Sequence, residues 1–577
     1  MIRTLTCLAS ASLVALAPMA AIAQEAAIYS SMDAVHPVWA ENAMVAVQEK
    51  AAAEVGLQVL KDGGNAVDAG VAVALALAVT LPRAGNLGGG GFMLVHDAET
   101  GETKAIDYRE MAPSSATRDM YLDAEGNADS RLSRFSGLAV GVPGTVAGMQ
   151  LALDTYGTMT LAEAAAPAIR LAEDGIAVTA DLADSLKALE KRLKASPASA
   201  AIFYKADGSF HEPGDVLKQP DLAATLKKIA DEGPDGFYKG SVAEAISASV
   251  QDAGGAMSLE DLAGYEAVIR EPVRGTYRGH EIVSMPPPSS GGTHIIQILN
   301  VMEGYPIGFL GHNSSDTIHL MAEAMKRAYA DRSEYLGDPD FVDVPVKALT
   351  SKNYAAEIRD GISLNRATPS ASIKPGKLAP YESDQTTHFS IVDKDGNAVS
   401  NTYTLNFSYG SGITAAGTGV LLNNEMDDFS AKPGVPNAYG LIGGDANAVE
   451  PRKRPLSSMS PTIVLKDGKP FLVTGSPGGS RIITTTLQVI SNMIDHGMNV
   501  AEATAASRIH HQWLPDEIRV EDGGLSRDTV AALEAKGHTI SVKSVMGSTQ
   551  SIHVDAEKGL LLGASDPRRP GAATVGY

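Results

Sequence analysis

The chain of 577 residues predicts an α+β fold, with a helix-rich first part and a strand-rich second part. Residues 42–81 and 150–270 are rich in alanine and in other helix-forming residues, with apolar positions at helical spacing. Hydrophobic periodicity is lost over residues 361–385, and strand-type alternation begins directly afterwards. A hydrophobic content of 44% with 57 glycines is typical of a globular enzyme, not of a fibre or a disordered chain.

The first 23 residues have the pattern of a secretory signal. Arg3 precedes an apolar stretch, and the small-residue site Ala-Ile-Ala at 21–23 comes before Gln24. An uncleaved membrane anchor is the alternative, but serines and a proline interrupt the stretch, which is shorter than the roughly 20 residues of a membrane span. We therefore expect residues 1–23 to be removed and the protein to be periplasmic or secreted. Cys7, the only cysteine, would leave with them, so the mature protein would contain no disulfide and no thiolate.

The charge and the apolar runs exclude several classes of protein. A formal net charge of -21 argues against a nucleic-acid partner. The longest apolar run, residues 69–81, is too short to span a membrane and predicts a buried helix. The glycine run 88–91 lacks the spacing of a phosphate-binding loop and predicts a structural turn. The adjacent histidines His510 and His511 would point apart, which favours packing or hydrogen bonding over a shared metal.

A β-hairpin is predicted directly after Gln385. The segment "THFSIV" alternates in polarity, "DKDGN" contains the Asp395-Gly396 turn signal, and "AVSNTYTL" returns as a second strand. Two adjacent threonines, Thr386 and Thr387, begin the first strand.

The turn decides which residues of the hairpin face each other. A two-residue turn would set Thr386 opposite Leu405 and Thr387 opposite Thr404. A four-residue loop would set Thr386 opposite Tyr403. Either turn places Thr404 within about one residue of Thr386. The face that they share stays open, because a slip of one residue reverses every side chain.

Cleavage before Thr386 would place a free amine beside its hydroxyl, and this amine could act as the base that activates the hydroxyl as a nucleophile. An internal threonine needs an external base, whereas an N-terminal threonine carries an amine of pKa about 7.7 to 8.0 that can accept its proton. The Thr386 hydroxyl could itself attack the Gln385 carbonyl and cut the chain. Taken alone, the threonine pair is more typical of an ordinary half-buried strand. No G-x-S-x-G or H-E-x-x-H motif offers another nucleophile or a zinc helix.

Seven motifs together resemble the γ-glutamyltransferase family, in order and with bacterial-type spacing. The motifs extend over nearly all of the chain after residue 23: "LPRAGNLGGGGFM" (81–93), "DYREMAP" (107–113), "TTHFSIVDKDGNAVSNTYTLN" (386–406), "LLNNEMDDFSAKPGVPNAYGLIGGDANAV" (421–449), "KRPLSSMSPTIV" (453–464), "TGSPGGSRI" (474–482) and "MGSTQSI" (546–552).

The resemblance implies an N-terminal nucleophile hydrolase that cuts its own precursor. The cut would fall between Gln385 and Thr386, giving a large subunit of residues 24–385 and a small subunit of residues 386–577. The two would fold together as a four-layer α/β/β/α sandwich. The implied activity is transfer of the γ-glutamyl group from glutathione and related compounds to water, amino acids or peptides, without a cofactor or a metal.

The resemblance also implies a role for each catalytic residue. Thr386 would attack the γ-carbonyl to form an acyl-enzyme, and Thr404 would support its hydroxyl. The backbone amides of Gly478 and Gly479 would hold the oxyanion, because a turn without side chains lets N–H groups approach the developing charge.

The glutamyl head group needs a pocket of both signs. Arg109 would bind the α-carboxylate as a forked donor, helped by the hydroxyls of Ser457 and Ser458. The α-ammonium would donate to Asn406, Glu425 and Asp428. The Gly- and Pro-rich segment 430–447 matches the family's lid, with Tyr439 at the closing position.

Two other functions remain open at this stage. A glutaryl or cephalosporin-type acylase would use the same nucleophile with a different pocket. The acidic set favours an amino-acid head group over a simple diacid, because a glutaryl group has no ammonium for Asp428 to meet. A secreted, non-enzymatic binding protein would remain a single uncut chain.

Overall fold

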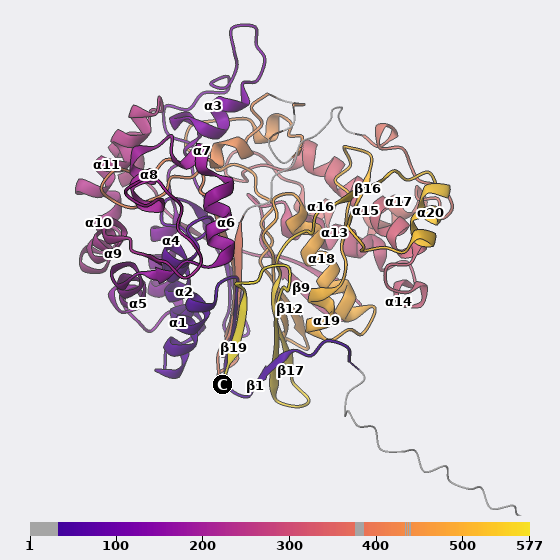
Figure 1. Ribbon diagram of the computed structural model, residues 1–577. Helices are drawn as coiled ribbons and strands as arrows, with labels where there is room; N and C mark the ends of the chain where they lie inside the picture. Colours follow the sequence, from indigo (N-terminus) through magenta and orange to yellow (C-terminus); the bar gives the residue numbers. More distant parts are fainter. Residues whose placement is uncertain (1–32, 375–385, 433, 436, 438–439) are drawn as a thin grey trace, which may run out of the picture. The chain divides into compact units, whose positions relative to one another are not determined.

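The computed structural model describes residues 33–374, 386–432, 434, 435, 437 and 440–577. Within the unit formed by residues 35–577, two seven-stranded β-sheets face each other and helices cover the outer face of each sheet (Figure 1). The predicted α+β class and its four-layer α/β/β/α form are therefore confirmed. The signal peptide and the residue before the proposed cut, Gln385, lie outside the described residues.

Each large sheet combines strands from both sides of the proposed cut. The first has the order β1 (Val38–Ala40), β18 (Leu560–Ser565), β17 (Gln550–Asp555), β13 (Lys469–Thr474), β12 (Thr462–Lys466), β9 (His280–Ser284), β8 (Val273–Tyr277). The second has the order β19 (Ala573–Gly576), β2 (Met44–Val47), β10 (Thr387–Val392), β11 (Ala398–Thr404), β3 (Gly90–His96), β4 (Thr103–Tyr108), β7 (Val268–Arg270). Two smaller sheets contain β14 (Ile509–His510), β15 (Ile518–Glu521) and β16 (Ile540–Lys543), and β5 (Ile176–Ala177) with β6 (Val216–Leu217).

One helical layer packs on the second sheet and comes from the first half of the chain (Figure 1). Its helices are α1 (Lys50–Lys61), α2 (Ala66–Thr80), α3 (Ser130–Phe135), α4 (Thr145–Tyr156), α5 (Leu161–Asp174), α6 (Ala180–Ala188), α7 (Glu190–Leu193), α8 (Pro197–Phe203), α9 (Pro220–Glu232), α10 (Asp235–Tyr238), α11 (Gly240–Asp252) and α12 (Leu259–Ala263). Every residue of α2 is buried, and Asn65 and Asp68 form its capping box. The helix predicted from the apolar run 69–81 is thus confirmed as buried.

The other helical layer packs on the first sheet. Its helices are α13 (Gly291–Met302), α14 (Ile307–Leu310), α15 (Ser315–Tyr335), α16 (Val346–Leu349), α17 (Lys352–Asp360), α18 (Arg481–Ile494), α19 (Val500–Ala505) and α20 (Arg527–Ala535). Short 3₁₀ turns complete the connections at η1 (Gly137–Ala139), η2 (Ser370–Ser372), η3 (Glu425–Asp428) and η4 (Asp445–Asn447).

The hairpin of β10 and β11 closes with a three-residue loop, so both predicted turns were wrong. Val392 pairs with Ala398, and the Asp393 amide donates to the Asn397 carbonyl at 3.0 Å. The Asp393 carboxylate accepts hydrogen bonds from the amides of residues 395 and 397, and Gly396 adopts a φ of 89°. These side-chain bonds stabilise a loop length that the Asp-Gly signal alone did not select.

The observed register settles which face the two key threonines share. Thr387 pairs with Tyr403, so Thr386 lies opposite Thr404. Phe389 packs against the helical layer that covers the second sheet, and strand side chains alternate between faces. Thr386 and Thr404 therefore belong to the face that lies between the two sheets.

Polar bonds tie the two sheets together on this inner face. Ser390 Oγ on β10 donates to the Gln550 carbonyl on β17 at 2.9 Å. Ser400 Oγ on β11 donates to the Thr474 carbonyl at 3.0 Å and accepts from the Thr462 amide at 3.0 Å. Since all of these groups are buried and paired, they fix the position of the β10–β11 hairpin against the opposite sheet.

The glycine run 88–91, which the sequence analysis predicted as a structural turn, leads into β3 and serves close packing. A Cβ on Gly88 would lie 2.1 Å from the Leu421 carbonyl oxygen. A Cβ on Gly89 would lie 2.0 Å from the Thr404 carbonyl oxygen. Only glycine lets the start of β3 approach the end of β11 this closely.

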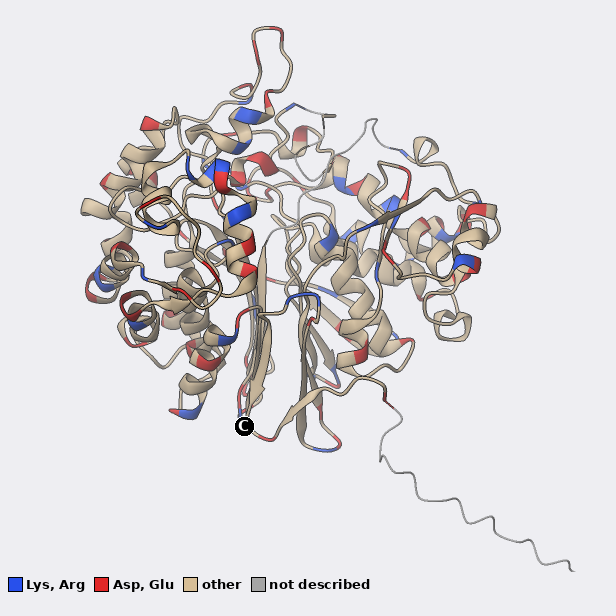
Figure 2. Ribbon diagram, viewed as in Figure 1, with Lys and Arg blue, Asp and Glu red and all other residues tan. Residues whose placement is uncertain are grey.

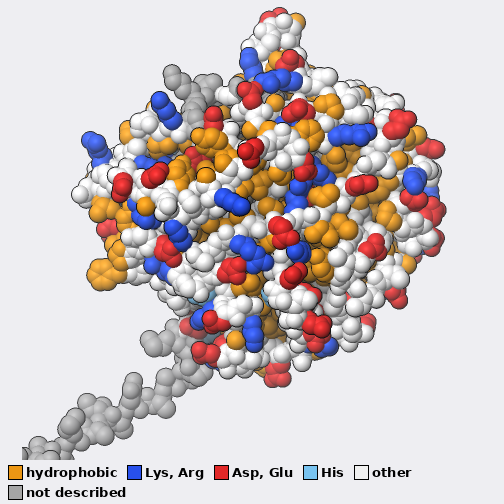
Figure 3. Space-filling view, turned by 180° about the vertical axis from the view of Figure 1, so that it is seen from behind, with side chains coloured by type: hydrophobic (Ala, Val, Ile, Leu, Met, Phe, Trp, Pro, Cys, Tyr) orange, Lys and Arg blue, Asp and Glu red, His pale blue; other side chains and the backbone are white. Residues whose placement is uncertain are grey.

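Charged side chains concentrate on the outer helices and loops, while the two sheets carry few of them (Figure 2). On the opposite face of the molecule, acidic and basic side chains are interspersed (Figure 3). None of the helices in the described part of the chain combines the length and the apolar character needed to cross a membrane.

Candidate active site

A small cavity of about 20 Å³ lies where β10 begins and β11 ends. Nine of the residues that the sequence predicted line it, together with three apolar residues. The lining consists of Arg109, Thr386, Thr404, Asn406, Glu425, Asp428, Leu441, Ser457, Ser458, Met459, Gly479 and Ile482. Tyr439 lies outside the described residues. The fold thus brings together residues that are more than 370 positions apart in the chain.

Thr386 immediately precedes β10, and its hydroxyl oxygen lies 3.4 Å from that of Thr404. Thr386 is 7% exposed, so it is nearly buried but borders the cavity. Thr404 Oγ1 also accepts a hydrogen bond from the Asn406 amide at 2.8 Å. Because this acceptor role orients the Thr404 hydroxyl, its proton can be donated toward Thr386.

The turn between β13 and α18 carries the two predicted oxyanion glycines. Gly478 has a φ of 135° and Gly479 a φ of 56°, both in the region that favours glycine. Their carbonyls accept bonds from the amides of Arg481 and Ile482, at the start of α18. Their own amides donate no hydrogen bond within the described residues. Gly479 lines the cavity with Thr386, whereas Gly478 is not among the lining residues. Free N–H groups before the start of a helix are suited to bind an anion.

Arg109 follows β4 and is fully buried at one wall of the cavity. Its guanidinium donates to Glu425, and its Nη2 atom lies 2.6 Å from Asp428 Oδ2. Its Nε donates to the Pro455 carbonyl at 3.1 Å. The sequence analysis assigned Arg109 and the two acids to opposite ends of one substrate, and the structure places them in direct contact.

A third acid, Glu110, lies beside this cluster and was missed by the sequence analysis. It is fully buried, its Oε2 lies 3.6 Å from Arg109 Nη1, and neither carboxylate oxygen has a hydrogen-bond partner within the described residues. Burial raises the pKa of Glu110 to about 7 and also raises the pKa of Glu425 and Asp428, although Arg109 opposes each shift. Arg109 is the guanidinium in direct contact with all three carboxylates, and burial holds the pKa of each carboxyl above its usual value.

Buried asparagines hold the backbone around the nucleophile. Asn406 has a φ of 72°, and its side chain donates to the Asn424 carbonyl at 2.9 Å. Asn86 donates to the Thr404 carbonyl at 2.9 Å and accepts from the Gly89 amide at 3.0 Å. Asn86 belongs to the motif of residues 81–93, but nothing in that motif alone indicates its long-range partner.

The hydroxyls of Ser457 and Ser458 both accept hydrogen bonds from the protein. Ser457 Oγ accepts from the Met459 amide at 3.0 Å, and Ser458 Oγ accepts from Arg332 Nη2 at 3.3 Å. Each hydroxyl therefore keeps its own proton for another acceptor. Both side chains line the cavity, so both hydroxyls can donate to a group bound there.

The predicted role of the adjacent histidines as hydrogen-bonding residues is confirmed. His510 Nδ1 lies 2.8 Å from Thr484 Oγ1, and its Nε2 lies 3.0 Å from Gln512 Oε1. His511 instead faces Asp516, with Nε2 at 3.4 Å from the carboxylate.

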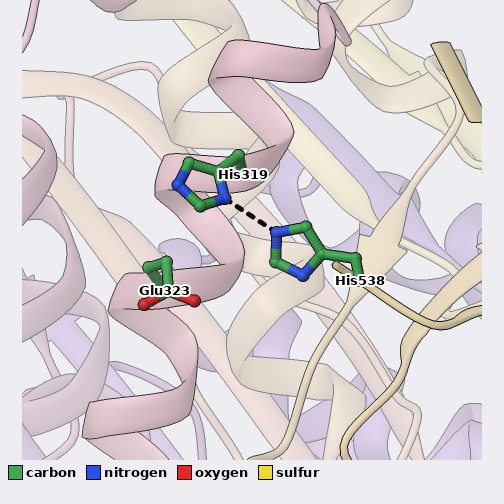
Figure 4. Close-up of side chains that lie close together, drawn as sticks. All are labelled: His319, Glu323 and His538. Carbon is green, nitrogen blue, oxygen red and sulfur yellow. Dashed lines mark hydrogen bonds between the residues drawn. The ribbon is translucent and has the colours of Figure 1, made fainter. Parts of the chain in front are cut away.

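Within the residues that the structure describes, His319, Glu323 and His538 are close enough to hold a metal ion (Figure 4). His319 Nε2 lies 2.7 Å from the Ser363 carbonyl and must donate to it, so its Nδ1 accepts from His538 Nε2 at 2.7 Å. Glu323 accepts from Arg327 Nη1 at 2.8 Å. The two histidines bond to each other and link α15 to the segment after α20, while Glu323 is paired with other groups.

Comparisons with known proteins agree with this geometry. A model of the gamma-glutamyltranspeptidase family matches residues 52–576. The glutathione hydrolase proenzyme of Escherichia coli (strain K12) is 61% identical over 546 residues, which cover 94% of this chain and 93% of that relative.

Two solved structures show the same relationship. Cephalosporin acylase from Bacillus halodurans aligns with a TM-score of 0.84 at 31% identity, over 96% of this chain and 99% of its own. Helicobacter pylori gamma-glutamyltranspeptidase aligns with a TM-score of 0.56 at 51% identity, over 56% of this chain and 93% of its own. The chain therefore belongs to the gamma-glutamyltranspeptidase family.

Proposed function

We propose that this protein is a self-cleaving γ-glutamyltransferase that removes the γ-glutamyl group from glutathione and related compounds. The observation that carries the proposal is the position of Thr386 at the start of β10, opposite Thr404, on the wall of a cavity that holds Arg109 and buried carboxylates. The group is passed to water or to an amino acid or peptide. The 61% identical relative from Escherichia coli, a glutathione hydrolase proenzyme, supports this substrate and a precursor form.

Maturation uses the Thr386 hydroxyl. Its oxygen attacks the carbonyl carbon of Gln385, the C–N bond of that peptide breaks, and the Thr386 nitrogen leaves as an amine. Water then hydrolyses the ester, which frees the carboxylate of Gln385. The products are a large subunit of residues 24–385, after loss of the signal 1–23, and a small subunit of residues 386–577. The Helicobacter pylori chain, which aligns over only 56% of this one, fits a chain divided in this way.

Transfer uses the same oxygen with the new amine as its base. The amine takes the Thr386 hydroxyl proton while the oxygen attacks the γ-carbonyl, and the amides of Gly478 and Gly479 stabilise the oxyanion. The leaving amine takes the proton and departs, leaving a γ-glutamyl ester on Thr386. Water or an acceptor amine attacks this ester, and the α-amino group accepts the attacker's proton.

Substrate binding exchanges ion pairs in the head-group pocket. A cavity of about 20 Å³ holds roughly one water molecule, so a glutamyl group enters only if side chains separate. The substrate carboxylate replaces a carboxylate on Arg109 and accepts from the hydroxyls of Ser457 and Ser458. The substrate ammonium then pairs with the released Glu425 or Asp428 and with Asn406. A zwitterionic head group supplies one negative and one positive charge, so each separated side chain gains a new partner of opposite charge. An uncharged head group supplies neither partner.

A glutaryl or cephalosporin-type acylase is the second candidate, because the Bacillus halodurans cephalosporin acylase shares the fold over 96% of this chain. The carboxylate of a glutaryl group would bind Arg109 in the same way, but the group has no ammonium to pair with Glu425 and Asp428 once they leave Arg109. The buried acids therefore favour the γ-glutamyl substrate. Tyr439 is proposed as the lid residue on the family resemblance alone.

The location follows from the proposed signal. We place the mature protein in the periplasm or outside the cell. The large and the small subunit of one precursor are each other's principal protein partner.

Intact mass and a denaturing gel of the purified protein test the maturation. We expect two bands, with the smaller beginning at Thr386. Hydrolysis of a γ-glutamyl anilide should exceed that of the matched glutaryl anilide, and a dipeptide acceptor should yield a γ-glutamyl peptide. A fully folded, uncut and inactive protein would instead support a binding function, and preference for the glutaryl anilide would support an acylase.

A further inference from the structure

A second buried arginine, Arg332, lies behind the serine pair of the cavity. It belongs to the last turn of α15 and is 4% exposed. Its Nε donates to Ser290 Oγ at 2.9 Å, and its Nη2 donates to Ser458 Oγ at 3.3 Å. Ser290 in turn donates to the Ser457 carbonyl through its hydroxyl at 2.8 Å and its amide at 2.9 Å. One guanidinium thus braces both serines that border the cavity.

Arg332 has no carboxylate partner within the described residues, in contrast to Arg109 and Arg508. Arg109 contacts Glu425 and Asp428, and Arg508 lies 2.6 Å from Asp566. No ion pair of Arg332 with an acid is present in the part of the chain that the structure describes. A buried, unpaired cation is costly, and its desolvation lowers the pKa of Arg332 to about 10. The group remains charged at neutral pH.

Two of the groups whose charges act on Arg332 belong to the cavity. Asp428 stabilises its cationic form and Arg109 destabilises it. Both residues line the cavity, as does Ser458, through which Arg332 contacts it. An anion that accepts from the Ser458 hydroxyl would therefore be the missing counter-charge.

We infer that Arg332 is a positioning and specificity residue that makes Ser458 a hydrogen-bond donor to the α-carboxylate of the γ-glutamyl substrate. The inference rests on the proposed function. Because Nη2–H occupies one lone pair of Ser458 Oγ, the hydroxyl proton points away from the guanidinium and toward the cavity. The positive charge of Arg332 also favours the substrate carboxylate at a site that lies beside acidic side chains. Arg332 contributes to substrate capture without touching the substrate.

The test compares Arg332→Met and Arg332→Lys with Arg327→Met in the full-length precursor. Arg327 lies on the same helix, but it is paired with Glu323 and lies outside the cavity lining. The measurements are precursor cleavage, kcat and KM for a γ-L-glutamyl anilide, and Ki for L-glutamate as a competing product. We expect Arg332→Met to raise KM and Ki together by about 10- to 100-fold, with cleavage intact and kcat within about threefold. The KM and Ki of Arg332→Lys should lie between those of the wild type and those of Arg332→Met. Arg327→Met should leave KM and Ki within about twofold of the wild-type values.

A double-mutant comparison tests whether Arg332 acts on substrate binding through Ser458. Arg332→Lys is also measured in a Ser458→Ala background, where its effect on KM should shrink to less than about twofold. An equal effect in both backgrounds would overturn the inference, as would a mature Arg332→Met enzyme with unchanged KM and Ki. If Arg332→Met does not fold, the lysine variant and its double mutant decide the question. Failure of the wild type to use the anilide would refute the proposed function instead.

Discussion

The hydroxyl oxygens of Thr386 and Thr404 face each other at 3.4 Å across the β10–β11 pair, on the face between the two sheets. This contact joins the residue directly after the proposed cut to the last residue of the neighbouring strand. It gives Thr386 a fixed neighbour before any chain cleavage, and it motivates the first two predictions.

Thr386→Ala should abolish both precursor cleavage and transfer, because one oxygen performs both reactions. The variant should fold as a single chain, since the substitution removes little beyond the hydroxyl. Thr386→Ser keeps the oxygen but loses the methyl that restrains χ1, so it should retain some of each reaction at lower rates. N-terminal sequencing of the smaller band and an anilide assay provide the measurements. An active Thr386→Ala enzyme, or a small subunit that begins elsewhere, would refute the mechanism.

Thr404→Val should slow cleavage and acylation by about 10- to 100-fold. It keeps the shape of the side chain but removes the donor to Thr386 and the acceptor of the Asn406 amide. Thr387→Val is the matched control. Thr387 Oγ1 is buried on the opposite face and has no hydrogen-bond partner within the described residues. The control should therefore mature normally, with equal or higher stability. Single-turnover cleavage and burst kinetics measure the two rates. Equal rates for the Thr404→Val and Thr387→Val variants would show that Thr404 takes no part in the reaction.

Arg109→Lys should weaken substrate capture more than self-cleavage. Lysine keeps the charge but loses the planar fork that contacts two carboxylate oxygens at once. The expected loss is about 1 to 3 kcal/mol in kcat/KM, the range for hydrogen bonds to charged groups. The extent of precursor cleavage in the same preparation serves as the internal control. Unchanged KM and kcat would show that Arg109 does not anchor the carboxylate.

Glu110 should make the protein less stable as the pH rises toward 7. Its pKa in the folded protein is raised from 4.5 to about 7 by burial, so the folded state holds a proton that the unfolded state has lost. Stability therefore falls between about pH 4.5 and 7, by at most about 3 kcal/mol.

Glu110→Gln removes this titration and tests the sign. The melting temperature of the variant minus that of the wild type should increase from pH 5 to pH 8. Glu102→Gln, an exposed acid in the β4 region, should show a constant difference. A difference for Glu110→Gln that stays flat or decreases would mean that Glu110 is already ionised at pH 5.

The sequence predicted the α+β class from local signals such as strand alternation and turn residues. Most of the cavity lining was predicted only through the resemblance of seven motifs to a known family. It did not predict the loop length of the β10–β11 hairpin, which depends on hydrogen bonds of the Asp393 side chain. It also missed the contact of Arg109 with Glu425, two residues separated by 316 positions. Nothing local in the sequence indicates that Arg332 and Glu110 are buried, and their significance depends on that burial.

The position of β10 between β2 and β11 has a consequence for the lifetime of the protein. A cut at Thr386 releases the end of an interior strand, so each half contributes strands to both sheets and neither half has a complete core of its own. We expect the precursor to complete its fold before it cuts itself. Once cut, the two chains no longer share the covalent connection that brought their strands together, and refolding becomes a bimolecular search. Maturation would thus make unfolding a one-way event and set the durability of the enzyme by its unfolding rate.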